Sequence, residues 1–294
     1  MRWRKAAILG VGLLGGSLGL ALRRRGLVGE VSGFVRREAT AADAVRCGAV
    51  DTAATRLEAV VSGADLVVLC TPVARMGPLA LELAPHLMAG MTVTDVGSVK
   101  AGVLAAVNGP VRRAGGVFIG SHPLAGSERT GVGAARADLF AGAVCVVTPA
   151  PDDDASAVAR VTGLWGAVGA RVLEMSAEDH DRLVSRSSHL PHVVAAALAN
   201  YILSGQHPAA QSLLCASGFR DTTRIASGSP EMWRDIALAN RDALLAAMHD
   251  LAAQLGDFEK ALRAGDHDAV LDYFASAKRR RDGWCGNGGP AVSE

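Results

Sequence analysis

The sequence of 294 residues has few of the features that mark metalloproteins, exported proteins or nucleic-acid-binding proteins. Its five cysteines are scattered, with no Cys-x-x-Cys pair and no Cys/His metal spacing, so we expect reduced thiols in a cytoplasmic protein without a metal site. The formal net charge is only +1, which gives no reason to expect nucleic acid or an anionic membrane as a partner. No internal repeat or low-complexity tract is present.

A secreted or membrane-spanning protein is also not indicated. Residues 6–22 are uncharged and follow basic residues, as in a signal peptide. The run contains five glycines, which are poor helix formers, and it is shorter than the roughly 20 residues of a membrane span. Arg23-Arg24-Arg25 follow at the point where a cleavage site would lie. We therefore expect neither export nor membrane insertion.

The same glycines fit a dinucleotide-binding turn. Residues 5–9 are expected to form a strand, and Gly10-Val11-Gly12-Leu13-Leu14-Gly15 opens a helix that ends near Arg24. In such a G-x-G-x-x-G motif Gly10 allows a tight turn, Gly12 lets a pyrophosphate approach the backbone, and Gly15 lets the helix pack on the strand. The N–H groups at the start of the helix, which includes Leu13 and Leu14, face the phosphates. A glycine-rich core turn without a ligand is the alternative.

The next expected strand, residues 31–35, bears on the choice of cofactor. Proteins that bind NAD usually carry Asp or Glu at its end, where the carboxylate accepts from the ribose 2′-hydroxyl. Here the position falls at or beside Val35 and is followed by Arg36 and Arg37. A guanidinium grips a 2′-phosphate, so NADP is favoured over NAD. The alternative is that both arginines are simply solvated.

Alternating strands and helices continue to about residue 175. Further strands are expected at residues 65–70, 91–94, 117–119, 143–148 and 171–174, with a helix at 156–168. This pattern predicts a doubly wound, mostly parallel α/β sheet of the Rossmann type, with residues 1–175 as the dinucleotide-binding domain. Polar side chains follow three of the strands, at Thr71, at Ser98 with Lys100, and in the loop expected to hold His122. Each could cap a helix, but together they predict a site at one edge of the sheet.

After Met175 the pattern becomes helical, and residues 176–282 are expected to form an all-α domain that Ser176 opens as an N-cap. Pro191 interrupts the first long helix of this domain. Four polar residues lie on one stripe of that helix, and they line either a cavity or a solvent-exposed face: Asp181, Ser185, Ser188 and His192.

Three further features of the helical part are expected. Asp221 lies three residues before Arg224, so it can orient that guanidinium, although an ordinary intrahelical ion pair is the alternative. Six apolar residues at heptad spacing predict packing within a bundle or across a dimer: Leu244, Met248, Leu251, Leu255, Phe258 and Leu262. Residues 283–294 are expected to form a flexible tail.

Five motifs occur together, in order, between about residues 5 and 282: the glycine loop from Gly10 to Ser17, Asp95-Val96-Gly97-Ser98-Val99-Lys100, His122-Pro123-Leu124-Ala125-Gly126-Ser127-Glu128, Ser188-His189-Leu190-Pro191-His192 and Gly218-Phe219-Arg220-Asp221-Thr222-Thr223-Arg224. With these motifs the sequence resembles the prephenate/arogenate (cyclohexadienyl) dehydrogenase family. The resemblance implies a nucleotide-binding domain and a helical dimerisation domain, through which the protein would form a homodimer. It also implies oxidative decarboxylation in tyrosine biosynthesis, of prephenate to 4-hydroxyphenylpyruvate or of arogenate to tyrosine.

The resemblance also implies roles for individual residues. His122 matches the catalytic histidine, Ser98 its hydroxyl partner and Arg224 the arginine that binds the ring carboxylate. Glu128, Ser188 and His192 match further active-site positions of the family. Asp221 matches a supporting acid. A histidine base suits this chemistry because its usual pKa lies near neutrality. We expect His192 to donate to the keto acid of prephenate, and Glu128 to accept from the ammonium of arogenate.

Two other classes of protein remain open at this point. A β-hydroxyacid-type dehydrogenase would share the two-domain plan but would be expected to use a lysine base. A nucleotide-sensing protein without turnover would need only the glycine loop, so the presence of His122, Ser98 and Arg224 argues against it.

Overall fold

A six-stranded parallel sheet forms the centre of the first part of the chain. The structure, a computed structural model, describes residues 2–127, 129–205 and 208–286. The strand order is β3-β2-β1-β4-β5-β6, all parallel. The strands are β1 (Trp3–Leu9), β2 (Val28–Phe34), β3 (Thr52–Ala54), β4 (Leu66–Leu69), β5 (Thr92–Asp95) and β6 (Val117–Phe118). The predicted doubly wound α/β class is confirmed, although β3 was not expected from the sequence.

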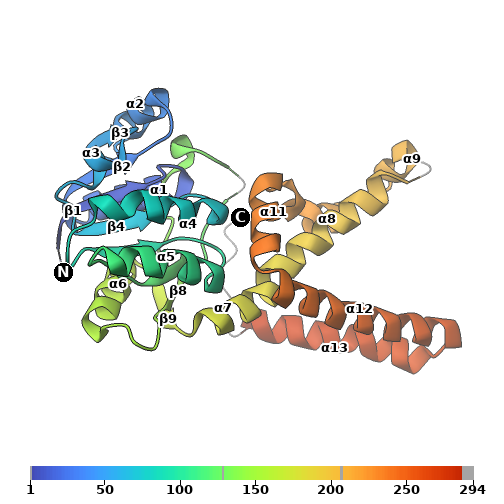
Figure 1. The fold of residues 1–294 in the computed structure, drawn as a ribbon. Helices are drawn as coiled ribbons and strands as arrows, with labels where there is room; N and C mark the ends of the chain where they lie inside the picture. Colours follow the sequence, from blue (N-terminus) through green and yellow to red (C-terminus); the bar gives the residue numbers. More distant parts are fainter. Residues whose placement is uncertain (1, 128, 206–207, 287–294) are drawn as a thin grey trace. The chain divides into compact units, whose positions relative to one another are not determined.

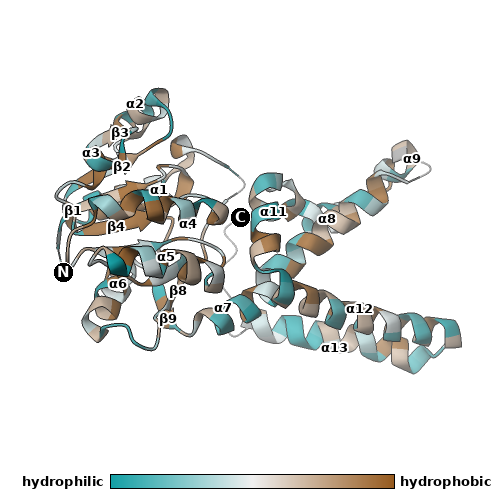
Figure 2. Cartoon of the chain, viewed as in Figure 1, coloured by the Kyte–Doolittle hydropathy of each residue, from teal (hydrophilic) through white to brown (hydrophobic). Residues whose placement is uncertain are grey.

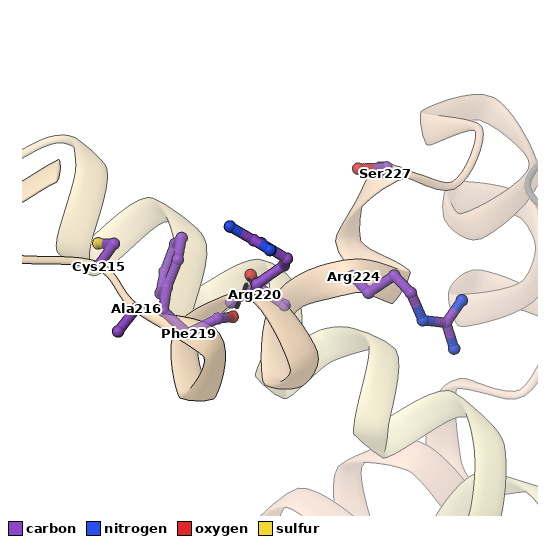
Figure 3. Close-up of a pocket in the computed structure, with 7 residues that line it drawn as sticks. Cys215, Ala216, Phe219, Arg220, Arg224 and Ser227 are labelled. Atoms are coloured by element: carbon purple, nitrogen blue, oxygen red, sulfur yellow. Dashed lines mark hydrogen bonds between the residues drawn. The ribbon is translucent and has the colours of Figure 1, made fainter. Parts of the chain in front are cut away.

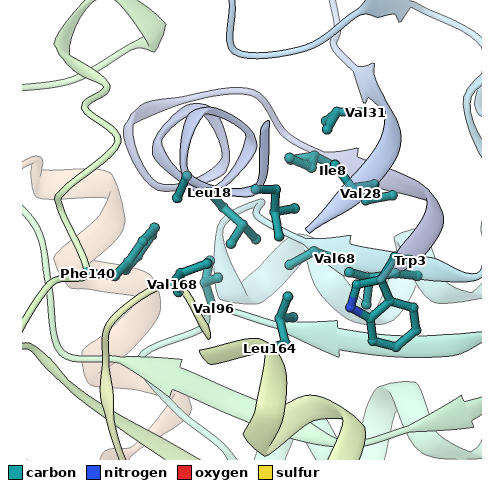
Figure 4. Close-up of a cluster of buried hydrophobic side chains, with 14 of the residues drawn as sticks. Trp3, Ile8, Leu18, Val28, Val31, Val68, Val96, Phe140, Leu164 and Val168 are labelled. Atoms are coloured by element: carbon teal, nitrogen blue, oxygen red, sulfur yellow. The ribbon is translucent and has the colours of Figure 1, made fainter. Parts of the chain in front are cut away.

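Helices cover both faces of this sheet because side chains alternate along each strand. On β1, Ala6 and Ile8 belong to one buried cluster, whereas Ala7 and Leu9 belong to the other. The first cluster contains residues of α1 (Leu13–Arg24) and α6 (Ala155–Ala167), and Figure 4 shows part of it. The second contains residues of α3 (Leu57–Val61), α4 (Val73–Leu83) and α5 (Ala101–Arg113). Figure 2 shows hydrophobic residues both in the strands of this sheet and in the helices around it. The short helix α2 (Glu38–Arg46) follows β2.

His122 lies in a strand of a second, smaller sheet. The expected strand at 117–119 ends at Phe118, and β7 (Gly120–Pro123) begins immediately afterwards. It pairs antiparallel with β8 (Val144–Thr148), which pairs parallel with β9 (Arg171–Glu174). The prediction that His122 lies in a loop is therefore wrong. Pro123 is compatible with a strand here because β7 is at the edge of its sheet.

After β9 the described chain is helical. It contains α7 (Ala177–Val184), a π-helical turn (Ser185–His189), α8 (Leu190–Leu203), α9 (Pro208–Leu213), α10 (Ser217–Thr223), a 3₁₀ turn (Arg224–Ser227) and α11 (Pro230–Ala239) (Figure 1). Ser176 accepts from the N–H of Asp179, which confirms the expected N-cap of α7. The interruption expected at Pro191 takes the form of the π turn, whose wider spacing lets α7 continue into α8.

The chain divides into two compact units, Met1–Arg241 and Asp242–Glu294, so the change from strands to helices after Met175 lies inside the first unit. The second unit is a helical hairpin of α12 (Arg241–Ala264) and α13 (His267–Gly286). Phe258 packs against Tyr273 and Phe274, with ring centroids 4.6 and 5.6 Å away.

Residues 283–286 of the expected tail are helical, and 287–294 lie outside the described residues. Across the described ranges, no helix is both long and apolar enough to cross a membrane.

Candidate active site

The glycine loop lies between β1 and β4, where the direction of winding reverses. Gly10 has φ +110°, and a Cβ there would lie 2.6 Å from the carbonyl oxygen of Cys70. A Cβ on Gly15 would lie 2.2 Å from the carbonyl oxygen of Gly10. Both positions are closed to a side chain by the protein itself. A Cβ on Gly12, in contrast, would meet nothing within 4 Å, so the space beside it is open to a ligand.

The start of α1 fits the phosphates of a dinucleotide. Gly12 is the N-cap, and no side chain caps the helix or places an acidic group in its first turn. The N–H groups of Leu13 and Leu14 are therefore left for an anion, while their side chains pack against the core. Thr71, which follows β4, has a buried hydroxyl oxygen without a hydrogen-bond partner among the described residues. Such an unpartnered group beside an open loop is what a bound nucleotide would satisfy.

The end of β2 carries no free acid. Val35 is buried, and Arg36 and Arg37 are exposed. In the described ranges, neither arginine takes part in an ion pair. The first acid, Glu38, accepts a hydrogen bond of 2.7 Å from the Thr55 hydroxyl. Both guanidinium groups thus remain available to an anionic ligand at this end of the sheet.

His122 is held in β7 opposite Val146, with 8% of its surface exposed. Its Nδ1 atom lies 2.8 Å from Nε2 of His180, and the two rings meet edge to face at 72°. Burial is the main reason that the pKa of His122 is held well below its usual value, and His180, Lys100 and His189 lower it further. His122 is therefore neutral at pH 7 and able to accept a proton.

A second contact holds His180 from its other side. Its Nδ1 atom lies 2.8 Å from Oδ1 of Asp181, and the His180 side chain is fully buried. The Asp181 carboxylate also accepts from the N–H groups of Lys100 and Ala101, at 2.7 and 2.9 Å. It thus caps the start of α5 and fixes α7 beside it. Asp181 and Ser185, two residues of the polar stripe expected from the sequence, are thus buried.

A buried ion pair bonds to the backbone of β7 at Ser121. The Lys100 ammonium contacts the Asp95 carboxylate and donates to the carbonyl of Ser121 at 2.8 Å. Asp95 in turn accepts from the N–H of Ser121 at 2.9 Å, and the indole N–H of Trp165 donates to the Ser121 hydroxyl at 2.9 Å. The sequence placed Lys100 with Ser98 at the expected site, and in the structure its charge is paired inside the protein. It holds the residue before His122.

Ser98 lies half-buried after β5. No hydrogen bond joins its hydroxyl to His122 within the part of the chain that the structure describes; the ring partner of His122 is His180. The backbone of Ser98 faces His189, a buried residue of the π turn. Burial lowers the pKa of His189 to about 4. Asn240 donates to Nδ1 of His189 at 3.1 Å and to the carbonyl of Asp181 at 2.8 Å, which ties these elements together.

His192 and Ser188 lie on the next turn. The carbonyl of Ser188 accepts from Nδ1 of His192 at 2.9 Å, and the ring stacks on Trp233 with centroids 3.7 Å apart. Burial lowers the pKa of His192, and the nearby Arg224 guanidinium lowers it further. In the neutral ring Nδ1 carries the proton, so Nε2 can only accept. The role expected for neutral His192, a donor to a keto acid, therefore does not fit this tautomer.

Arg224 lines an open pocket of about 400 Å³ with Cys215, Ala216, Phe219, Arg220, Thr223 and Ser227. Its side chain extends away from Arg220 (Figure 3). Among the described residues no ion pair joins Arg224 to Asp221, which is exposed, so the predicted orienting contact is absent. The helix ends at Thr223, and the change to a 3₁₀ turn alters the expected i,i+3 geometry. Glu128 lies outside the described residues.

Two family models match most of this chain: the nucleotide-binding domain of prephenate dehydrogenase over residues 18–174, and its dimerization domain over residues 176–276. The chain belongs to the prephenate dehydrogenase family. It is 33% identical to cyclohexadienyl dehydrogenase of Zymomonas mobilis, over 95% of both chains. It is 35% identical to prephenate dehydrogenase of Bacillus subtilis, over 94% of this chain and 75% of that one.

Solved structures of the prephenate dehydrogenase family superpose over nearly the whole chain. Prephenate dehydrogenase from A. aeolicus, in complex with hydroxyphenyl propionate and NAD+, has a TM-score of 0.89 and 32% identity, over 96% of this chain and 98% of that one. Synechocystis arogenate dehydrogenase has a TM-score of 0.80 and 32% identity, over 95% and 99%. A 3-hydroxyisobutyrate dehydrogenase from Salmonella typhimurium, at 14% identity and a TM-score of 0.60, shares the fold. The β-hydroxyacid class is thus similar in fold alone, and this family member is an oxidoreductase.

The sequence did not predict that several of the residues around His122 belong to the site of this prephenate dehydrogenase family member. His180 is 58 positions away and has no motif of its own, although its position beside Asp181 on the polar stripe was a signal. Trp233 and Asn240 also join these residues only through the tertiary structure. Asp95 belongs to one of the sequence motifs, but its pairing with Lys100 was not expected. Composition and spacing do not reveal which of these groups pack together.

Proposed function

We propose that this protein oxidises and decarboxylates prephenate to 4-hydroxyphenylpyruvate with a nicotinamide cofactor, as a step of tyrosine biosynthesis. The observation that carries the proposal is His122, a buried and neutral histidine whose Nδ1 is already bonded. Its Nε2 has no hydrogen-bond partner among the described residues. The reaction needs a group that takes the proton of the ring hydroxyl, and a neutral imidazole meets that need.

The glycine loop would hold the cofactor. The open space beside Gly12 and the N–H groups of Leu13 and Leu14 suit the pyrophosphate, Gly10 and Gly15 shape the turn, and the unpartnered Thr71 hydroxyl offers a further contact. When bound, the nicotinamide accepts the hydride from the carbinol carbon of the ring. We further propose NADP in preference to NAD, because Arg36 and Arg37 are exposed and free of ion pairs within the described residues.

Proton movements in this reaction fall to His122. The hydroxyl proton passes to Nε2 as the hydride leaves the carbinol carbon. Loss of the ring carboxylate as carbon dioxide leaves its electron pair in the ring, which becomes aromatic. The ring oxygen then regains a proton as a phenol, and protonated His122 is placed to return it. Ser98 would contact the same hydroxyl rather than His122 itself.

The substrate carboxylate would be bound by Arg224, whose fork of N–H donors matches it. The Arg224 guanidinium lowers the pKa of His192, which supports the proposal that both residues act on the same substrate. Ser188 holds His192 through its carbonyl. Glu128 remains a proposed position at the substrate side chain. Asp221 remains a proposed supporting acid, and it is exposed in the single chain.

Arogenate is the second candidate substrate. It carries an ammonium group where prephenate carries a keto oxygen, and neutral His192 offers an acceptor rather than a donor. The similarity to a cyclohexadienyl dehydrogenase and to an arogenate dehydrogenase also favours testing it. The tautomer of His192 thus supports use of arogenate beside prephenate.

A homodimer formed through the helical region is also proposed. Several large apolar side chains of α8 and the segment after it are exposed in the single chain: Tyr201 at 82%, Leu213 at 86% and Leu214 at 79%. A second copy would remove them from water, which is the usual reason for such a patch. Light scattering of the purified protein would give the mass of a dimer; Leu213→Asp should shift it toward that of a monomer.

The test of the proposed function is an assay of the purified protein with each substrate and each cofactor. Formation of reduced cofactor with prephenate, together with 4-hydroxyphenylpyruvate and carbon dioxide in equal amounts, is the expected result. Activity with arogenate alone would replace prephenate by the second candidate. Turnover of neither substrate, in protein that binds the cofactor, would refute the proposal.

A further inference from the structure

The hydrogen-bond capacities of three side chains determine which nitrogen of His122 is protonated. The Asp181 carboxylate is an acceptor only, and it already accepts two backbone N–H groups. The contact of 2.8 Å with His180 therefore requires a proton on Nδ1 of His180. In the neutral His180 ring the other nitrogen, Nε2, is then an acceptor. The contact of 2.8 Å with His122 in turn requires a proton on Nδ1 of His122.

We propose that His180 and Asp181 act as a positioning relay that holds His122 in the Nδ1-protonated tautomer, leaving Nε2 as the atom that takes the substrate's proton. This inference rests on the proposed function, because it assigns His122 as the base. It adds two positioning residues that do not themselves touch the substrate. Their order is His122, His180, Asp181, from the reacting hydroxyl inward.

The relay also supplies a negative charge when His122 becomes protonated. Burial and Lys100 both disfavour a positive imidazolium at this position. The Asp95 carboxylate is already paired with Lys100, and neutral His189 offers no compensating charge. Asp181 is the carboxylate connected to His122 through an unbroken pair of hydrogen bonds. The positive charge can thus be stabilised along the relay without Asp181 taking up the proton.

A purely structural role for His180 is the alternative. A buried histidine can simply satisfy its two nitrogens inside a core. The two explanations differ in their consequences, because a structural role predicts loss of stability without a change in the protonation of His122. The relay predicts a change in the tautomer and in the pH profile even where the protein stays folded.

Two substitutions of His180 separate these explanations. The amide of His180→Gln keeps one acceptor and one donor, as a neutral histidine does, whereas His180→Leu removes both. Trp165→Phe is the matched control, because it removes a buried hydrogen bond to Ser121 beside β7 without touching the relay. Melting temperatures would be measured for all three variants and for the parent.

The first readout is the pH dependence of kcat and kcat/KM. His180→Leu should lower kcat by about 10- to 100-fold, less than loss of the base itself, which costs about 100- to 10,000-fold. Its acidic limb should move to lower pH, because the imidazolium loses its counter-charge. His180→Gln should recover much of kcat, and Trp165→Phe should keep the parent profile. A His180→Leu variant that is folded and has the parent kcat and profile would overturn the relay.

The second readout needs no substrate. In protein labelled with nitrogen-15, the ring of His122 should show a protonated Nδ1 and an unprotonated Nε2 near pH 7. The His180→Leu variant should show a mixture of the two tautomers. A parent protein with the proton on Nε2 would refute the relay, whichever substrate the enzyme uses. An inactive parent protein with the expected tautomer would instead contradict the proposed function while leaving the relay in place.

Discussion

Replacing Gly12 and Gly15 by alanine, one at a time, should separate ligand binding from packing in the same loop. A methyl group on Gly15 would lie 2.2 Å from the carbonyl oxygen of Gly10 and 2.9 Å from Cγ2 of Ile8. Neither can move without disturbing the turn or the core strand. A methyl group on Gly12 would meet no protein atom within 4 Å. The two substitutions add the same methyl group at two positions of one loop.

The expected size of the Gly15→Ala effect follows from two opposing contributions. Overpacking of this kind costs up to about 3 kcal/mol, while alanine gains about 1 kcal/mol of helix propensity over glycine. The net loss of about 2 kcal/mol corresponds to a fall in melting temperature of about 4–8 °C for a domain of this size. Gly12→Ala should stay within about 1 kcal/mol of the parent, because its only cost is a less favourable N-cap.

Cofactor binding should show the opposite order. The methyl group of Gly12→Ala would occupy the open space assigned to the pyrophosphate. The affinity of this variant for the cofactor should therefore fall at least about tenfold, or about 1.4 kcal/mol. Thermal unfolding without ligand and a titration with NADP and NAD measure the two effects separately. The reasoning fails if Gly12→Ala binds both cofactors as the parent does, or if it unfolds as early as Gly15→Ala.

Four further outcomes are expected. His122→Asn should lower kcat by about 100- to 10,000-fold. Because burial lowers the pKa of His122, the acidic limb of the pH profile of the parent enzyme should lie below pH 6.5, and a limb above pH 6.5 would contradict this effect of burial. Arg36→Ala with Arg37→Ala should raise the KM for NADP more than that for NAD, and equal changes would argue for NAD. Arg224→Ala should cost about 1.5–3 kcal/mol, seen mostly as a higher KM for either substrate; an unchanged KM would remove it from the carboxylate site. His192→Ala should impair arogenate at least as much as prephenate, because the neutral ring is an acceptor; a selective loss with prephenate would favour the donor role instead.

Much of the sheet and the cofactor loop could be predicted because their signals are local. The strand before Gly10 and the helix after Gly15 follow from hydrophobic runs and from the space that glycine leaves. The cap at Ser176 follows from a side chain that satisfies an N–H group three residues away. Each of these depends on neighbours within a few positions, so the sequence by itself determined the doubly wound fold and the cofactor end of the site.

The tertiary structure alone decided how the chemical groups meet. β7 is recognisable as a strand only through its pairing with β8, more than twenty positions along the chain. The contact of His122 with His180 spans 58 positions, and that of Lys100 with Asp181 spans 81. Spacing rules reach along one helix or strand, whereas these contacts depend on which elements pack together and which polar groups become buried. The sequence determined that a histidine would be present, and the packing of α7 against β7 and α5 decided which of its nitrogens is bonded to His180.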